Sequence, residues 1–228
     1  MDKKAFALEL YNIGAFQTKD RSPDGKGFSL KAHSRNPELP LSPFYLNLRT
    51  ITHAKNGPLG EYHIAQIVEL MHEVALSHRL RYHCVVGVPD AATEFAEAYV
   101  RARRRWGQEL DFIQLAKAPT ENKFGYSINL MLTPLYGYSR TLVLDDVLTA
   151  ADTKLQTIRV LETYGIEVGG IVVLVDRDQG GRRVLIEAGY PIVSIYTIWE
   201  LIDLYLEVGL ISQELFEEIE RYLKIPAT

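Results

Sequence analysis

The chain alternates between short apolar runs and longer segments in which apolar residues recur at helical spacing. The short runs predict strands at residues 28–31, 44–47, 83–88, 110–115, 141–146, 170–175 and 191–196. The helical spacing predicts helices at residues 5–15, 59–80, 90–105, 153–164 and 181–188, and two more between residues 198 and 223. Asp90 and Ser212 are the expected N-caps of the third and the last helix, and Gly209 separates the last two. This alternation predicts an α/β fold, a mainly parallel twisted sheet flanked by helices on both faces.

Residues 117–135 interrupt this regular alternation. They contain two prolines and a glycine, which predicts a mobile loop or a hairpin. No internal repeat, low-complexity tract or convincing linker divides the 228 residues, so we expect one domain over residues 1–228.

Composition and charge narrow the class of protein. The 25 Lys and Arg residues and 29 Asp and Glu residues give a net charge of −4, which provides no global attraction to nucleic acid. The single cysteine, Cys84, excludes an internal disulfide framework and suits a reducing compartment. No apolar run approaches the roughly 20 residues that cross a bilayer, and the N-terminus lacks the pattern of a signal peptide. We therefore expect a cytoplasmic protein that does not contact a membrane.

Two adjacent carboxylates, Asp145 and Asp146, end one of the predicted strands. A turn of small residues with two threonines follows, and a predicted helix begins at Thr153. The carboxylates could accept hydrogen bonds from a ribose diol, while the N–H groups and hydroxyls of the turn and the helix N-terminus could bind a phosphate. The central strand of any α/β protein also ends in polar residues, so the segment alone leaves both interpretations open.

Residues 140–153, RTLVLDDVLTAADT, resemble the phosphoribosyl-diphosphate signature of type I phosphoribosyltransferases, with Ala151 where that family usually has glycine. Four further parts of the chain, in order, resemble the orotate phosphoribosyltransferases: SLK at 29–31 with SPFYLNLR at 42–49, VGVPDAAT at 86–93, LVDRDQGG at 174–181 and VSIYTIWEL at 193–201. The resemblance covers about residues 28–205. It implies a type I phosphoribosyltransferase-like fold in which residues 1–50 form most of a small N-terminal hood.

The resemblance also implies a substrate site for orotate and phosphoribosyl diphosphate. Arg177 would pair with the orotate carboxylate, because a guanidinium binds a planar anion through two parallel hydrogen bonds. A surface or helix-capping arginine is the ordinary alternative. The other residues implied at the base and the diphosphate are Lys31, Phe44, Tyr45, Asp90 and Ala91. Aromatic residues in a strand more often belong to the core, and an isolated lysine is more often solvated.

The paired acids are implied as catalytic residues and, through water, as a site for Mg²⁺. The turn after them would surround the 5′-phosphate, with Thr149, Ala150, Ala151, Asp152 and Thr153. A carboxylate at residue 152 disfavours phosphate binding unless it points away or caps the helix. An alanine at residue 151 restricts the backbone geometry that a phosphate-binding turn needs.

The basic loop departs further from the family pattern. The family normally has an arginine–lysine pair followed by a mobile loop with another lysine and a polar residue before glycine. Lys117 and Lys123 correspond to the two lysines and are the implied catalytic residues of this loop, but Ala116 replaces the arginine and Phe124 the polar residue.

Three functions therefore compete. The first is Mg²⁺-dependent transfer of a phosphoribosyl group to orotate in pyrimidine synthesis, by a homodimer. The second is the same chemistry with another base, and the third is a nucleotide-binding or regulatory homologue with impaired catalysis. The basic segment from Arg101 to Trp106 would suit RNA in the third case, but such a helix end is more often a solvated face or a dimer edge, so nucleic acid is not expected.

Overall fold

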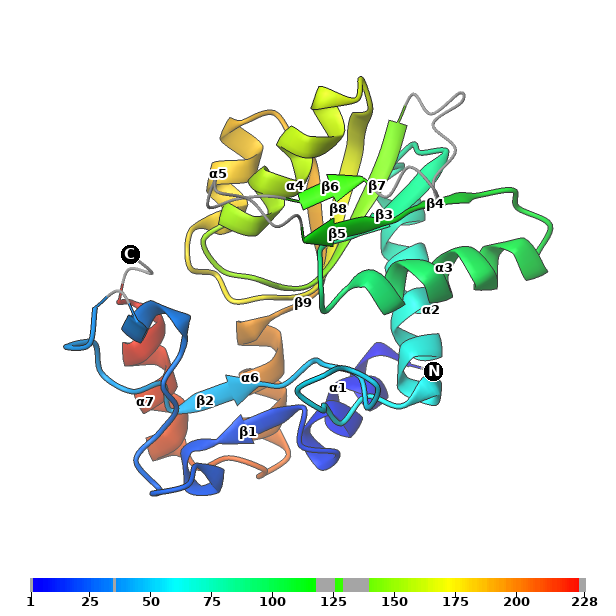
Figure 1. The fold of residues 1–228 in the computed structure, drawn as a ribbon. Helices are drawn as coiled ribbons and strands as arrows, with labels where there is room; N and C mark the ends of the chain where they lie inside the picture. The colour runs from blue at the N-terminus through cyan, green and yellow to red at the C-terminus, as the bar shows by residue number, and fades with distance from the viewer. Residues whose placement is uncertain (1, 35, 118–125, 129–139, 226–228) are drawn as a thin grey trace.

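A computed structural model describes residues 2–34, 36–117, 126–128 and 140–225 (Figure 1). Five strands form its central sheet, in the spatial order β4-β3-β7-β8-β9. Their bounds are β3 Cys84–Gly87, β4 Asp111–Ile113, β7 Arg140–Leu148, β8 Glu167–Asp176 and β9 Ile192–Thr197. All four neighbouring pairs are parallel, as predicted, so the carboxyl ends of these strands meet at one edge of the sheet.

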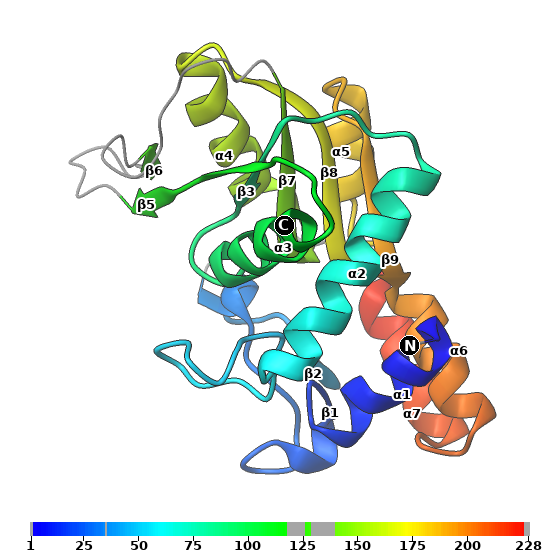
Figure 2. The ribbon, with the colours of Figure 1, turned by 90° about the vertical axis from the view of Figure 1, so that its right-hand side faces the viewer.

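Alternate side chains of the central strands β3 and β7 enter two separate cores. Leu142 and Leu144 of β7 belong to one, while Val143 belongs to the other. The first core is covered by α2 (Glu61–Ser77) and α3 (Thr93–Arg105), and the second by α4 (Asp152–Thr163) and α5 (Gly181–Glu187). Figures 1 and 2 show these two pairs of helices on opposite faces of the sheet, which confirms the predicted layers.

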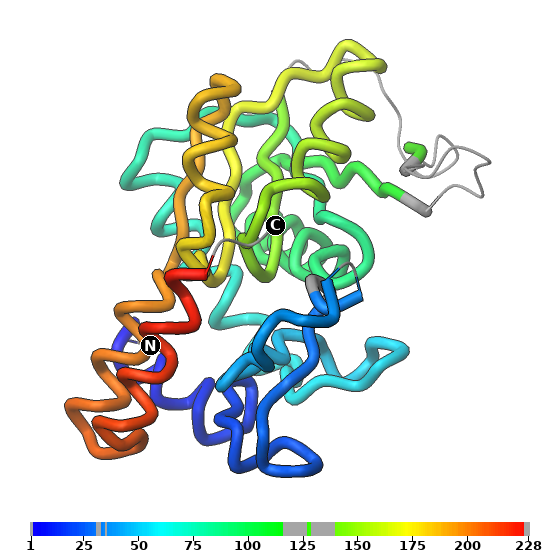
Figure 3. The backbone as a smooth tube through the Cα atoms, turned by 90° about the vertical axis from the view of Figure 1, so that its left-hand side faces the viewer, coloured from blue at the N-terminus to red at the C-terminus, as the bar shows by residue number. Residues whose placement is uncertain are grey.

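A second group of elements lies beyond the carboxyl edge of the sheet, and we call it the hood. It contains α1 (Lys3–Asn12), β1 (Phe16–Thr18), β2 (Phe44–Leu46), α6 (Ile198–Glu207) and α7 (Gln213–Leu223). β1 and β2 pair antiparallel, and a short 3₁₀ helix, η1 (Lys19–Arg21), follows β1. Figure 3 shows the red C-terminal helix beside the blue N-terminal segments, so the hood contains both ends of the described chain.

Aromatic packing and polar contacts hold the hood together. The rings of Phe16 and Phe44 stack with centroids 5.6 Å apart, and Tyr205 of α6 meets Phe16 edge-on at 4.9 Å. Lys3 pairs with Glu200 at 2.9 Å, while the Tyr11 hydroxyl donates to the carbonyl of Leu210 at 2.7 Å. The predicted division of the last segment at Gly209 is confirmed, and the Ser212 hydroxyl accepts from the N–H of Leu215 as the cap of α7.

Two local predictions were wrong. Residues 28–31 do not form a strand: Phe28 makes an isolated bridge with Ser42, because β1 takes the place beside β2, and Lys31 begins the 3₁₀ helix η2 (Lys31–Ser34). Asp90 does not cap α3. The chain first turns, with the N–H of Ala92 donating to the carbonyl of Val88 at 3.1 Å, and the helix starts later with Ala92 as its N-cap.

The chain after β4 contains a further pair of strands. A second strand, β5 (Leu115–Lys117), pairs antiparallel with β6 (Tyr126–Ile128) outside the main sheet, which supports the hairpin alternative for part of residues 117–135. Lys123 lies outside the described residues. Within the described chain, no helix has the length and apolar character needed to span a membrane.

Candidate active site

A cavity of about 700 Å³ lies between the carboxyl edge of the sheet and the hood. Its walls come from the loops after β3, β7 and β8 on one side, and from residues 29–55 and the end of α7 on the other. The residues that were predicted in a substrate site and that line it are Tyr45, Ala91, Asp145, Asp146, Thr149, Ala150, Ala151, Asp152, Thr153 and Arg177. The structure thus brings together segments that are more than 100 residues apart in the chain.

The paired acids lie within β7, which continues past them to Leu148 and is therefore longer than predicted. The N–H of Asp146 donates to Asp145 Oδ1 at 2.9 Å, and the N–H of Val147 donates to Asp146 Oδ1 at 2.7 Å. Burial raises the pKa of Asp146 to about 7, the charge of Asp145 adds to this effect, and Lys154 opposes it. One member of the pair can therefore exchange a proton near neutral pH.

Lys154, in the first turn of α4, is a cavity residue that the sequence interpretation missed. Its ammonium contacts the carboxylate of Asp145 and donates a hydrogen bond to the carbonyl of Val147. The position just after the phosphate turn, one residue beyond Thr153, was the available signal. The lysine brings a positive charge to the part of the cavity that the two acids would otherwise make strongly negative.

The turn from Thr149 to Thr153 has the backbone conformation of a helix entry. Ala151 occupies the left-handed region, with φ 66° and ψ −8°, and is the N-cap of α4 without a capping side chain. The alanine has therefore not prevented the conformation for which glycine is favoured. Asp152 begins α4 as an exposed residue, and residues 150–154 line the cavity, so the N-terminus of α4, where an anion is stabilised, borders this space.

The loop after β8 fixes this turn from the other side. The N–H of Gly181 donates to the carbonyl of Thr149 at 2.8 Å. A Cβ atom at Gly181 would lie 2.2 Å from that oxygen, so only glycine allows this approach. The loop after β8 and the turn after β7 are consequently held close together beside the cavity.

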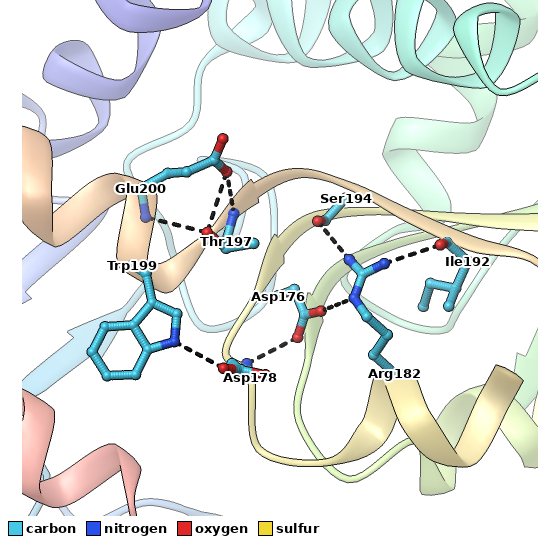
Figure 4. Close-up of polar contacts among 8 residues, drawn as sticks. All are labelled: Asp176, Asp178, Arg182, Ile192, Ser194, Thr197, Trp199 and Glu200. Carbon is cyan, nitrogen blue, oxygen red and sulfur yellow. Dashed lines mark hydrogen bonds and ion pairs between the residues drawn. The ribbon is translucent and has the colours of Figure 1, made fainter. Parts of the chain in front are cut away.

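Figure 4 shows the polar network that holds the segment around Arg177. Buried Asp176 accepts from the N–H of Asp178 at 2.9 Å and from Arg182 Nε at 2.6 Å. Arg182 also donates to the carbonyl of Ile192 at 3.1 Å and to the Ser194 hydroxyl at 2.8 Å. The Trp199 indole donates to Asp178 Oδ2 at 2.8 Å, so both ends of the loop are tied to β9 and α6.

The Arg177 side chain is buried between this loop and the hood. Its guanidinium lies 4.6 Å from the centre of the Phe44 ring, and its backbone N–H donates to the carbonyl of Leu148 at 3.0 Å. Nε and Nη2 are buried without a hydrogen-bond partner in the described part of the chain. Burial lowers the pKa of Arg177 from its ordinary value, and the neighbouring Tyr222 hydroxyl partly offsets this. These two unpaired donors form one edge of the guanidinium.

The hood contributes a mixed aromatic and basic wall. Tyr45 lines the cavity, accepts a hydrogen bond from Arg49 Nη1 at 2.6 Å and packs near Phe28, with ring centroids 5.5 Å apart. Phe44 does not line the cavity: its ring is fully buried and packs against the guanidinium of Arg177. Arg49 and Lys55 also reach the cavity and were not predicted as site residues, although Arg49 belongs to the quoted SPFYLNLR segment.

The remaining predicted residues have different positions. Asp90 is exposed and is not among the lining residues, whereas its neighbours Pro89 and Ala91 are. The backbone of Lys31 lies in η2, and Lys117 is the last residue of β5. Their contacts with a substrate stay predictions, as does the role of Lys123.

The basic segment at the end of α3 is not a uniform surface. Arg103 is only 5% exposed, pairs with Glu69 and lies 5.8 Å from the centre of the Tyr99 ring. Arg104 donates to the carbonyl of Leu110 at 3.1 Å, while Trp106 is 77% exposed. One arginine of the cluster therefore stabilises the contact between α2 and α3 and is not available to an external partner.

Comparison with known proteins agrees with this architecture. The crystal structure of orotate phosphoribosyltransferase from Aeropyrum pernix superposes with a TM-score of 0.65 and 22% identity, over 91% of this chain and 99% of that one. UMP synthase from Leishmania donovani gives a TM-score of 0.70 at 20% identity, over 98% of this chain but only 42% of that longer chain. The parallel sheet, its flanking helices and the cavity at the carboxyl edge therefore define a type I phosphoribosyltransferase fold.

Sequence relatives identify the family within this fold. Orotate phosphoribosyltransferase from Pyrobaculum aerophilum is 31% identical over 164 residues, which cover 71% of this chain and 76% of the relative. The corresponding protein of Sulfurisphaera tokodaii is 25% identical over 183 residues, 80% and 85% of the two chains. No protein-family model matches the chain. The chain belongs to the orotate phosphoribosyltransferase family.

Proposed function

We propose that this protein transfers the phosphoribosyl group of phosphoribosyl diphosphate to orotate, as a step of pyrimidine nucleotide synthesis. The bond between the ribose C1′ and the diphosphate oxygen breaks, and a bond from C1′ to the N1 atom of orotate forms. Diphosphate leaves with the bonding electron pair and the N1 proton is lost, so the products are orotidine 5′-phosphate and diphosphate. Family membership and the charge pattern of the cavity support this reaction.

The unpaired edge of Arg177 is the observation that carries the choice of orotate. Its Nε and Nη2 groups are buried donors without a partner among the described residues, and such groups cost free energy until a ligand satisfies them. Two adjacent N–H groups match the two oxygens of a carboxylate. Orotate carries a carboxylate at neutral pH, whereas uracil and the common purines have none, so this edge favours an anionic pyrimidine.

The opposite end of the cavity suits the phosphorylated sugar. Asp145 and Asp146 would accept hydrogen bonds from the ribose hydroxyls. The turn that contains Thr149, Ala150 and Thr153 would surround the 5′-phosphate with N–H groups and hydroxyls at the N-terminus of α4. Left-handed Ala151 sets the direction of these groups, and exposed Asp152 would have to point away from the phosphate.

The site also fits Mg²⁺ bound mainly through the substrate. Within the described chain, no group of three or more His, Cys, Asp or Glu residues could hold a metal by itself. Asp145 and Asp146 would hold the water shell of an ion that the diphosphate brings. Such an ion would neutralise charge on the leaving diphosphate. Lys31, Lys117 and Lys123 would add basic groups, and the proposal includes a homodimer and a cytoplasmic location, as the resemblance implies.

The residues of this chain would act chiefly by position and charge. The reaction passes through a state with positive charge on the sugar ring, so holding the base and C1′ in line lowers the barrier. Arg177 would fix the base by its carboxylate, while the acids fix the ribose. The hood would cover the base, and water would be excluded from C1′ on that side.

The test is the loss of orotate absorbance with phosphoribosyl diphosphate and Mg²⁺. We expect turnover in the unchanged protein, none in the Asp145→Asn, Asp146→Asn double variant, and about a 100-fold or larger loss of kcat/KM for orotate in Arg177→Ala. Arg183→Ala is the matched control, because this arginine is 79% exposed, lies on α5 and does not line the cavity. A folded protein that turns over another base but not orotate would contradict the proposal.

A further inference from the structure

The C-terminal helix α7 reaches the base end of the cavity. Tyr222, in its last turn, is one of the lining residues, although it lies beyond residues 28–205 that resemble the family. Figure 3 shows the end of this helix in red beside the yellow segment that follows β8. The C-terminal helix and the residue Ile225 just after it therefore join a site whose other lining residues all come before residue 180.

Tyr222 belongs to a compact cluster with Phe44 and Arg177. Its ring meets the Phe44 ring edge-on, with centroids 6.3 Å apart and an interplanar angle of 90°. The Arg177 guanidinium lies 4.6 Å from the centre of the same Phe44 ring. Tyr222 and Arg177 both line the cavity, and the Tyr222 hydroxyl opposes the lowering of the Arg177 pKa by burial. The tyrosine thus brings a hydroxyl to the neighbourhood of a guanidinium whose Nε and Nη2 have no partner among the described residues.

The position of Tyr222 is fixed by the rest of α7. Ile219 and Leu223 are buried in the large core, and Glu218 pairs with Lys19 of the hood. The Ser212 hydroxyl caps the start of the helix. Because these contacts order the helix on both sides of the tyrosine, its hydroxyl is held beside Arg177 before any ligand binds.

We propose that Tyr222 is a specificity-determining residue that recognises the carboxylate of the acceptor base together with Arg177. A phenol has one proton to donate and oxygen lone pairs that accept. Its oxygen accepts from the guanidinium, and its O–H donates to the carboxylate. The carboxylate then receives three hydrogen bonds: two from the free edge of Arg177 and one from Tyr222. This inference rests on the proposed function and extends it to a residue of the C-terminal helix.

This arrangement selects against neutral pyrimidines. A base without a carboxylate would leave the Arg177 edge and the Tyr222 hydroxyl without partners in a buried place. A site built to hydrogen-bond one group rejects ligands that lack it for this reason. The selectivity should therefore appear in binding, and it should depend on the hydroxyl more than on the ring.

The test compares binding of orotidine 5′-phosphate and uridine 5′-phosphate by calorimetry, since the two nucleotides differ only in the carboxylate. Tyr222→Phe keeps the ring against Phe44 and removes the hydroxyl. We expect it to bind orotidine 5′-phosphate about tenfold more weakly, which is about 1.4 kcal/mol, and to leave uridine 5′-phosphate binding unchanged. In steady state, KM should rise for orotate and stay the same for phosphoribosyl diphosphate.

Tyr190→Phe is the control, because its hydroxyl donates to Glu162 at 2.6 Å outside the cavity, and it should change neither binding constant. Thermal unfolding of both variants checks the fold, and Tyr222→Leu, which also removes the ring, should weaken orotidine 5′-phosphate further. Equal weakening of both nucleotides by Tyr222→Phe, or no change, would overturn the role of the hydroxyl and leave the proposed function standing. Failure of the unchanged protein to bind orotidine 5′-phosphate would overturn both.

Discussion

The ammonium of Lys154 contacts the carboxylate of Asp145, and these two side chains are only 4% and 5% exposed. The lysine also donates to the carbonyl of Val147, so it joins the first turn of α4 to the end of β7 across the phosphate turn. Because a buried carboxylate is costly without a counter-charge, the pair is a structural requirement of this turn as well as part of the cavity wall.

Replacing Lys154 by Met should therefore destabilise the protein. The change leaves Asp145 buried without its partner, which typically costs about 3–5 kcal/mol. For a chain of this length we expect the melting temperature to fall by about 6–20 °C, measured by calorimetry. Adding Asp145→Asn to this variant should recover part of the loss, because the uncompensated charge is gone. A double variant no more stable than Lys154→Met alone would contradict this explanation.

The raised pKa of Asp146 predicts a stability that falls with pH. Below the ordinary Asp value near 3.8 the group is protonated in the folded and the unfolded chain, and its contribution is fully present. As the pH rises through about 7, the folded protein must ionise a partly buried carboxyl beside Asp145, and that contribution is lost. Melting temperatures measured from pH 4 to pH 8 without ligand should show this decline. The same measurement on Asp146→Asn gives the part of the pH dependence that comes from other titrating groups.

Asp146→Asn removes the titrating group and should flatten this part of the pH profile. At pH 8 the variant should be more stable than the unchanged protein by about 1 kcal/mol, well below the full shift because the side chain is only partly buried. That corresponds to a melting temperature about 2–4 °C higher. The same variant should lose transfer activity, so stability and activity would change in opposite directions. A less stable variant at pH 8 would exclude this assignment.

Ala151→Gly should stabilise the phosphate turn. A left-handed conformation costs a non-glycine residue about 1–2 kcal/mol, and φ at this position is 66°. Glycine loses more chain entropy on folding, so we expect a net gain of about 1 kcal/mol or less in the free energy of unfolding. Denaturant unfolding measures it. KM for phosphoribosyl diphosphate should be unchanged or lower, since the same backbone conformation is kept; a higher KM would show that the alanine methyl group contributes to binding.

Gly181→Ala should have the opposite effect. In an open helix this change would stabilise by about 1 kcal/mol, but here the new Cβ would meet the carbonyl oxygen of Thr149 at 2.2 Å. The two loops must then separate, and we expect about 2 kcal/mol of destabilisation and about a tenfold higher KM for phosphoribosyl diphosphate. Urea unfolding and initial rates measure these two effects. A stabilised variant would show that the approach of the loops is not needed.

The sequence allowed the central sheet and much of the site to be predicted, because both depend on local signals. The apolar runs of β7 and β8 and the helical spacing of α4 each lie within about 12 residues. Asp145 lies near the carboxyl end of β7, and Arg177 directly follows the neighbouring strand β8, so a parallel sheet places them near one cavity.

The parts that were missed depend on long-range packing. Phe44 was expected to wall the base, but stacking on Phe16 turns its ring into the core, and Phe16 belongs to a three-residue strand too short to show a period. In the sequence, Lys154 cannot be told from an ordinary exposed lysine of a helix. Its contact with Asp145 appears only when the first turn of α4 packs against β7. Tyr222 lies 178 residues from Phe44 in the chain, and no local pattern links them.

The hood has a consequence for the order in which the protein can fold. Its inner aromatic residues, such as Phe16, come early in the chain, whereas their partner Tyr205 lies in α6 and is synthesised much later. The ion pair of Lys3 with Glu200 spans 197 residues. Contacts between residues this far apart in the sequence form slowly. Apolar surface that stays exposed until its partner segment has been synthesised is prone to aggregate. A growing chain would therefore expose these rings until α6 and α7 have left the ribosome, which makes the early hood segment a candidate client for chaperones.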